Sequence, residues 1–210
     1  MPPEQYTVSV IIWGGDKPGE DPAGHVAIAV HHSTSQPTAC HMHHARCPDQ
    51  IRFIYESRPH QFFDADPAPR GRCNLRTDLS PAEAMKANDV LSHFGTDITH
   101  LPFFGDGNCH NWNAAAVTAL EEAGLILKGD GDRWNAMIGM GPLAIKTKWV
   151  EAEGREWVSC RKFDSNRPAT VDAKWGDEPE SKTNGGMVDI KDRVRNLQQL
   201  LHSRKDHTAQ

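Results

Sequence analysis

Several features that define common protein classes are missing from this chain of 210 residues. No apolar run approaches the roughly 18–20 residues that span a bilayer, and the first residues lack the basic flank and apolar stretch of a secretory signal. The five cysteines are odd in number, and their spacing does not indicate a disulfide scaffold. We therefore expect a protein of the reducing cytoplasm that does not bind membranes.

The net charge of -5 excludes a broad basic surface for nucleic acid. A local basic patch is still compatible with the sequence, and its candidate members are Arg46, Arg52, Arg58, Arg70, Arg72 and Arg76. An apolar content of 38% favours a globular domain with polar segments.

Residues 1–163 are expected to form one α+β domain, followed by a polar linker at 164–186 and an amphipathic helix and tail at 187–210. The last helix could dock on the domain, mediate oligomerisation or fold with a partner. Strands are expected at 6–13, 25–31, 39–43, 50–56, 143–150 and 156–163, and helices at 80–95, 109–123 and 134–140. The polar segment 59–74 is expected to form a surface loop.

Cys109 stands in the segment GNCHNWN, directly before a strongly helical run that stops at Gly124. A thiol at a helix N-terminus lies near free backbone N–H groups and the positive end of the helix dipole, which favour its ionisation. A thiolate is the nucleophile of covalent acyl transfer. Asn108 is expected to cap this helix. The alternative is a structural cysteine.

His25 begins the predicted strand HVAIAVH, after a loop rich in Gly and Pro. The alternation of Val26, Ile28 and Val30 directs one face of the strand to a core, which leaves the imidazole at the edge of the sheet. A histidine there can abstract the thiol proton if the helix of Cys109 packs against this edge. The alternative is an ordinary polar residue at a strand end.

A cluster of histidines lies between Cys40 and Cys47 (CHMHHARC). His41 and His43 share one face of a strand and could bind one ion, but zinc takes three or four ligands and the spacing matches no standard zinc module. We therefore expect no metal site and no cofactor, with metal storage as an alternative. One histidine of this cluster is expected to hydrogen-bond the second nitrogen of His25 and fix its tautomer.

The candidate substrate-binding residues are Glu56, Asp106, His43 and Trp112. The Glu56 carboxylate could bind a cationic group or simply pair with Arg58, and Asp106 has the same two interpretations. Trp112 is expected to be buried on the inner side of its helix and to fix the orientation of the first turn.

This order of motifs resembles the circularly permuted papain-like enzymes, in which the histidine precedes the cysteine. The superfamily includes NlpC-type amidases, lecithin:retinol acyltransferase-like proteins and the deSUMOylating PPPDE isopeptidases. The matching motifs are the strand GHVAIAV and the helix start from Asn108 to Trp112, and a second family histidine matches His41 best and His43 next. The resemblance covers residues 6–126 and implies a permuted papain-like fold, with an antiparallel sheet packed against the Cys-bearing helix.

More narrowly, the chain is similar to the fungal arginine-containing cyclodipeptide synthases, which have a Tyr-Glu-x-Arg-Pro-like stretch, here at 55–59, before an Asn-Cys-x-x-Trp helix. These enzymes of secondary metabolism condense arginine with a second amino acid, both delivered as aminoacyl-tRNAs. The resemblance implies an aminoacyl-enzyme at Cys109, attack by a second amino group and closure to a diketopiperazine. It makes Glu56 or Asp106 the candidate for the arginine side chain, and aminoacyl-tRNA a partner of the local basic patch.

The expected mechanism uses Cys109 as nucleophile, His25 as general base and then acid, and His41 to orient His25. The backbone N–H of Cys109 and a neighbouring group would hold the oxyanion, an interaction whose loss typically costs roughly 10²–10³ in rate. Water as acceptor would make a cysteine peptidase or amidase, and an amine would make a transferase. A binding module that keeps the fold without catalysis is the third alternative.

Overall fold

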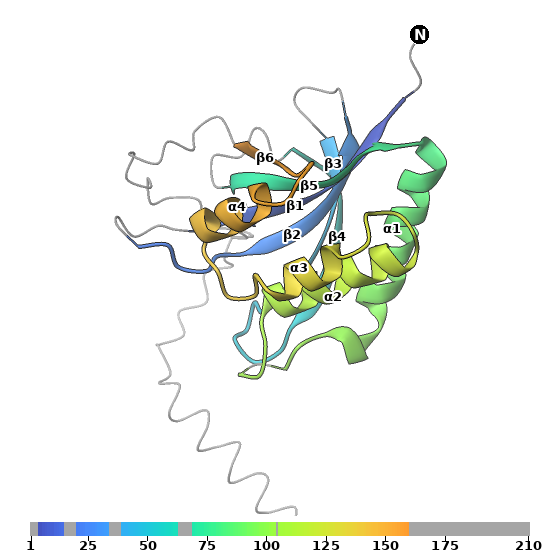
Figure 1. The fold of residues 1–210 in the computed structure, drawn as a ribbon. Helices are drawn as coiled ribbons and strands as arrows, with labels where there is room; N and C mark the ends of the chain where they lie inside the picture. The colour runs from blue at the N-terminus through green and yellow to red at the C-terminus, as the bar shows by residue number, and fades with distance from the viewer. Residues whose placement is uncertain (1–3, 15–19, 34–38, 63–68, 104, 160–210) are drawn as a thin grey trace, which may run out of the picture. The chain divides into compact units, whose positions relative to one another are not determined.

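A computed structural model of the chain describes residues 4–14, 20–33, 39–62, 69–103 and 105–159. This part is α+β, with one six-stranded antiparallel sheet and four α-helices (Figure 1). The strands are β1 (Tyr6–Trp13), β2 (Val26–His32), β3 (Ala39–Arg46), β4 (Ile54–Phe62), β5 (Pro69–Leu79) and β6 (Glu156–Ser159). The helices are α1 (Pro81–Thr96), α2 (Cys109–Glu122), α3 (Asp130–Asn135) and α4 (Pro142–Val150), with a 3₁₀ turn η1 at Ile98–His100. The expected linker and C-terminal helix lie outside the described residues.

The sheet has the strand order β4-β3-β2-β1-β5-β6, so β1 and β2 lie at its centre. Their pairing sets Val10 opposite Ile28, and the next strand sets His43 opposite Ile28. Successive residues of β1 face opposite sides of the sheet, as in any strand. Val10 therefore joins the large core under the helices, whereas Ile11 joins a second, smaller cluster with Met42 on the other face.

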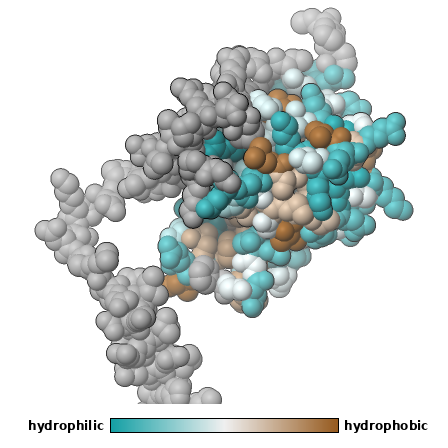
Figure 2. Space-filling model, turned by 60° about the vertical axis from the view of Figure 1, so that its left-hand side comes forward, coloured by the Kyte–Doolittle hydropathy of each residue, from teal (hydrophilic) through white to brown (hydrophobic). Residues whose placement is uncertain are grey.

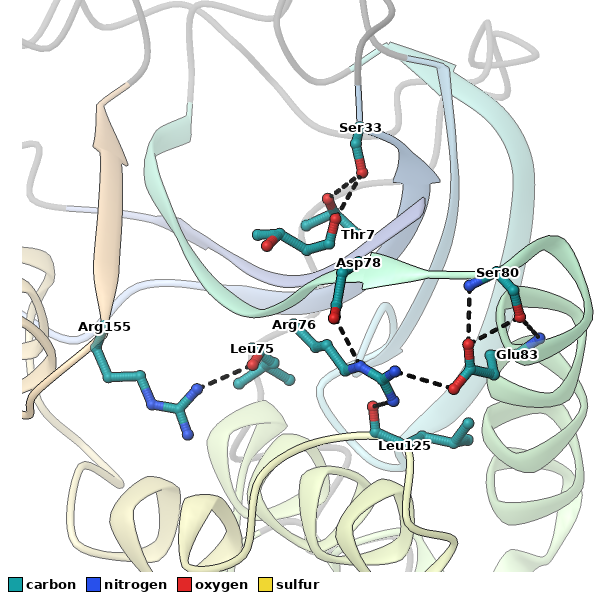
Figure 3. A network of polar contacts seen from close by, with 10 residues as sticks. Thr7, Ser33, Leu75, Arg76, Asp78, Ser80, Glu83, Leu125 and Arg155 are labelled. Carbon is teal, nitrogen blue, oxygen red and sulfur yellow. Dashed lines mark hydrogen bonds and ion pairs between the residues drawn. The ribbon is translucent and has the colours of Figure 1, made fainter. Parts of the chain in front are cut away.

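Helix α1 begins at a complete capping box. The Ser80 hydroxyl accepts the backbone N–H of Glu83, and the Glu83 carboxylate accepts the backbone N–H of Ser80 at 2.8 Å. Arg76 connects the start of α1 to neighbouring segments, because its guanidinium group donates to Glu83, to Asp78 and to the carbonyl of Leu125 (Figure 3). The end of β5, the start of α1 and the segment after α2 are therefore held by one set of polar contacts.

Two predicted elements are wrong and a third is displaced, because the helix expected at 134–140 lies at Asp130–Asn135 (α3). The segment 59–74 is not a surface loop throughout, because it holds the end of β4 and the start of β5, and 143–150 is a helix rather than a strand. In β5, polar side chains alternate with buried ones, which makes this half-buried strand resemble a loop in sequence. In α4, Ile145 and Trp149 are spaced four apart and both buried, and Asp21 from a distant loop accepts the N–H groups of Leu143 and Ala144.

The surface of the described part has small apolar patches between hydrophilic side chains, as one face shows (Figure 2). The large apolar side chains most exposed to solvent are Ile98 and Phe103, each 79% exposed. Among the described residues, no helix is both long and apolar enough to cross a membrane.

Replacing the cap of α1 should destabilise the protein measurably. Ser80→Ala removes the acceptor for the Glu83 N–H, and we expect the free energy of unfolding to fall by about 1 kcal/mol. Urea unfolding measures the change. Ser92→Ala in the interior of the same helix is the matched control and should have no destabilising effect. Equal stabilities of the Ser80→Ala protein and the wild type would contradict the capping box.

Candidate functional site

Cys109 is the first residue of α2, and the preceding turn fixes it there. Asn108 caps the helix: its side chain accepts the backbone N–H of His110 at 2.8 Å, and its own N–H donates to the Asn111 side chain at 2.9 Å. Before it, the N–H of Gly107 donates to the carbonyl of Phe103 at 3.2 Å and closes a tight turn. The predicted helix start and the capping role of Asn108 are therefore confirmed.

The thiol of Cys109 lies against the backbone just before and just after His25. Its Sγ is 4.0 Å from the Gly24 carbonyl oxygen, and the N–H of Val26 points to the sulfur. Burial raises the pKa of the thiol, and this outweighs the opposing effect of the N–H groups of Val26, Cys109 and His110. The expectation that the helix N-terminus would make this thiol ionise readily is therefore wrong for the resting protein, because desolvation is the larger effect.

Gly24 allows the end of β1 and the start of β2 to approach each other closely. A Cβ at Gly24 would collide with the carbonyl of Trp13, whose own N–H donates to the His25 carbonyl at 2.8 Å. The Gly24 carbonyl also faces α2, where the His110 ring nitrogen Nε2 lies 2.8 Å away. Gly24 thus brings the end of β1, the start of β2 and the first turn of α2 together.

The ring of His25 belongs to a series of polar side chains that crosses from β2 to β4. His25 Nε2 lies 2.8 Å from Nδ1 of His44 on β3, and His44 Nε2 lies 3.3 Å from the carboxylate of Glu56 on β4. Arg46 and Arg58 contact the same carboxylate, the latter through Nε at 2.8 Å. His44 is 1% exposed, so the series is shielded from water at its centre.

Both histidines of the series are neutral at neutral pH. Burial, aided by the neighbouring histidines and arginines, lowers the pKa of His25 to about 3. Burial likewise lowers the pKa of His44 to about 4, although Glu56 opposes the shift. Partial burial raises the pKa of Glu56, but hydrogen bonds from Arg46 and Arg58 outweigh this effect and hold that pKa below its usual range. The Glu56 carboxylate is therefore ionised.

These charges determine which ring nitrogens carry protons. An ionised Glu56 favours the proton of His44 on Nε2, which leaves His44 Nδ1 as an acceptor. His25 must then donate to it from Nε2. The remaining nitrogen of His25, Nδ1, consequently holds a lone pair and is the basic atom of the series.

The structure connects Cys109 to His25 through the main chain. Among the described residues, no hydrogen bond is recorded between Sγ and the His25 ring; the sulfur instead contacts Gly24 and Val26. Because those residues flank His25 directly, the thiol and the imidazole are linked through the backbone of residues 24–26.

The residue that orients His25 is His44, and the prediction of His41 or His43 is corrected. His41 Nε2 bonds the Ser57 hydroxyl at 2.6 Å. His43 is fully buried between sheet and helix, with Tyr55 Oη at 2.7 Å and Asn88 Oδ1 at 2.9 Å. The reason is strand alternation: His41 and His43 face α1, whereas His44 faces the opposite side.

The substrate-binding candidates have separate places. The Glu56 carboxylate is already held by two arginines and His44, so the predicted pairing with Arg58 is confirmed and little charge is left for a substrate. Trp112 is 1% exposed and packs near Tyr55, in agreement with its expected burial and not with substrate contact. Asp106 is exposed in the turn before Cys109.

The arginines expected to form a basic patch are largely engaged with protein groups. Arg46 and Arg58 contact Glu56, Arg76 pairs with Asp78 and Glu83, and Arg70 donates to the carbonyl of Gly14. Arg52 is 80% exposed, with Asp49 at 3.6 Å. These contacts reduce the positive charge that this set can offer to phosphates.

Sequence reasoning missed the roles of His44, Gly24 and His110. The alternation of side chains along the strands could have identified His44. Val26 points to the core under the helices, so His25 points to the other face of the sheet, where His44 also lies. Within the ranges described above, no three His, Cys, Asp or Glu side chains are grouped so as to hold a metal ion.

Comparisons with family models, curated proteins and solved structures gave no match.

Acid should destabilise the protein through its buried neutral histidines. His25, His43 and His44 have pKa values lowered to about 3, 4 and 4 in the folded state, against an ordinary value near 6.5 in the unfolded chain. Below pH 6.5 the unfolded chain therefore binds more protons, and stability falls as pH drops to about 4. Each histidine contributes up to about 1.4 kcal/mol per pH unit.

Urea unfolding between pH 7.5 and 4.5 measures this slope. His43→Gln should make it shallower, whereas His93→Gln, on the exposed face of α1, should leave it unchanged. A stability that does not vary over this range would contradict the burial of neutral histidines.

Proposed function

We propose that this protein is a cysteine-dependent acyl-transfer enzyme, with Cys109 as nucleophile and His25 as general base. The observation that supports this most is the polar series from His25 through His44 to Glu56, which begins at the residue whose backbone neighbours touch the thiol. A buried thiol needs a base, and a base needs a partner that fixes its tautomer. We infer that His44 and Glu56 are positioning residues for His25.

The Cys109 thiol and the His25 ring would both be uncharged before the substrate binds. The pKa of Cys109 is raised and that of His25 is lowered, so a standing thiolate–imidazolium pair is disfavoured. Proton transfer from Sγ to His25 Nδ1 would accompany attack on the substrate carbonyl, when charge moves to the carbonyl oxygen. His44 would stabilise the imidazolium that forms, with the Glu56 carboxylate behind it.

The chemistry then proceeds by addition and elimination. A bond forms between Sγ and the acyl carbon, and the backbone N–H of Cys109 at the helix N-terminus holds the oxyanion. The bond to the leaving group breaks, and His25 returns the proton to that group, which leaves a thioester on Cys109. An amine acceptor would attack the thioester carbon and lose a proton to His25. The bond between Sγ and the acyl carbon would break, the amide would leave, and the proton on His25 would return to the Cys109 sulfur.

The resemblance described above suggests the fold and the specific substrate. We propose that the sheet and the Cys-bearing helix form a permuted papain-like fold, with the histidine strand before the cysteine helix. We further propose that the acyl donors are aminoacyl-tRNAs, one of them charged with arginine, and that the product is a cyclic dipeptide. Because Glu56 is engaged, the exposed Asp106 is the candidate carboxylate for the arginine side chain.

Incubation with arginyl-tRNA and a mixture of other aminoacyl-tRNAs tests the substrate. We expect an arginyl or aminoacyl adduct on the Cys109 peptide by mass spectrometry, and a cyclic dipeptide containing arginine in the medium. Cys109→Ser should abolish both. Hydrolysis to free amino acids alone would reassign the protein as a hydrolase, and no adduct from any acyl donor would favour a binding module.

Substitutions of the two histidines should slow the acylation of Cys109 by an activated ester, such as a p-nitrophenyl ester, to different extents. His25→Ala should lower the rate of the first turnover by roughly 10²-fold or more, the usual contribution of a general base. His44→Asn should lower it by roughly 10–100-fold, as loss of an orienting partner does.

His41→Asn is the matched control, since it changes the same strand but not the series, and its rate should equal that of the wild type. A larger loss in His41→Asn than in His44→Asn would refute this assignment.

A further inference from the structure

Asn113 is a polar residue in an unusual place. It lies on α2 one helical turn after Cys109 and is 0% exposed. Neither its Oδ1 nor its Nδ2 has a hydrogen-bond partner among the described residues. A buried amide without partners costs folding free energy, so an apolar residue of similar size would be the more stable choice for packing alone.

The helix directs this amide towards the thiol. Residues four apart lie on the same face of an α-helix, and their side chains lean towards its N-terminus. The side chain of Asn113 therefore leans towards the first turn of α2, where Cys109 lies. Ala114 and Ala116 beside it are also fully buried and have no polar side-chain atoms to compensate the amide.

The partner of the thiol must change when it loses its proton. In the resting structure the S–H donates towards the Gly24 carbonyl oxygen, at 4.0 Å. A thiolate has no proton to donate, and a carbonyl oxygen repels its negative charge. The sulfur then depends on N–H donors. The backbone N–H groups of Val26, Cys109 and His110 already act on it, and a primary amide supplies two more.

We propose that the Asn113 amide is the donor that receives the Cys109 sulfur as a thiolate, when its proton leaves for His25. The sulfur turns from the Gly24 carbonyl towards Nδ2, and the amide that has no partner in the resting state gains one in the reactive state. This assignment rests on the proposed role of Cys109 as nucleophile, and it makes Asn113 a catalytic residue that contacts the reacting atom.

The pH dependence of alkylation by iodoacetamide, followed on the Cys109 peptide by mass spectrometry, tests the proposal. In Asn113→Leu, the midpoint should rise by about one to two pH units, because a hydrogen bond to a charged group is lost. The melting temperature should stay equal or rise, because an unpartnered buried amide is removed. Asn113→Thr keeps an O–H donor and should restore part of the shift.

Val117→Ala, on the same buried side of α2, is the matched control. It should lower the melting temperature through a cavity and leave the midpoint of Cys109 unchanged. An unchanged midpoint in Asn113→Leu would overturn the proposal. A fall in its melting temperature as large as that of Val117→Ala would also overturn it, because the amide would then have a structural partner.

The ester acylation of the wild-type protein separates this inference from the proposed function. Acylation at Cys109 with no midpoint shift in Asn113→Leu would remove only the role of Asn113. A midpoint shift without acylation by any donor would leave Asn113 as the thiolate donor and remove the enzymatic function.

Discussion

The close approach at Gly24 is the contact on which the candidate site depends. It allows β1 and β2 to meet at Trp13, and it leaves a carbonyl oxygen facing the first turn of α2, where the His110 ring and the Cys109 thiol both contact it. A larger residue would collide with the backbone of Trp13 and Gly14 and displace the start of β2. The backbone on either side of His25, which the thiol contacts, would then move with it.

The electrostatics of the site follow from burial more than from individual charges. Burial raises the pKa of Cys109 and lowers those of His25 and His44, so each favours its neutral form. The charge of Glu56 is more than offset by Arg46 and Arg58. This arrangement keeps the Cys109 thiol and the rings of His25 and His44 uncharged in the resting protein, which suits a base that would act during attack rather than before it.

The sequence predicted much of the fold and part of the site. The buried strand β1 and the capped helix α1 could be read from local patterns, because apolar alternation and a capping box act within a few residues. Helix α4 was missed because its cap comes from Asp21, more than a hundred residues away in the chain. Strand β5 was missed because its polar face is typical of a loop.

The site shows the same division. The helix start at Cys109 and its cap Asn108 could be predicted because a helix start is a local signal. The partner of His25 depends on which face each of two neighbouring strands presents. His44 shares the face of His25 and contacts it, whereas His41 lies on the opposite face and contacts Ser57. The engagement of Glu56 by Arg46 needs the pairing of β3 with β4, which no local pattern encodes.

The protonation of the His25 and His44 rings is the most direct measure of the account. Nitrogen-15 NMR of the imidazoles at pH 7 should find His25 neutral, with its proton on Nε2 and none on Nδ1, and His44 neutral with its proton on Nε2. This result would leave the lone pair of the neutral His25 ring on Nδ1. An imidazolium at His25, or a proton on its Nδ1, would contradict the series from His25 to Glu56 as the orienting device.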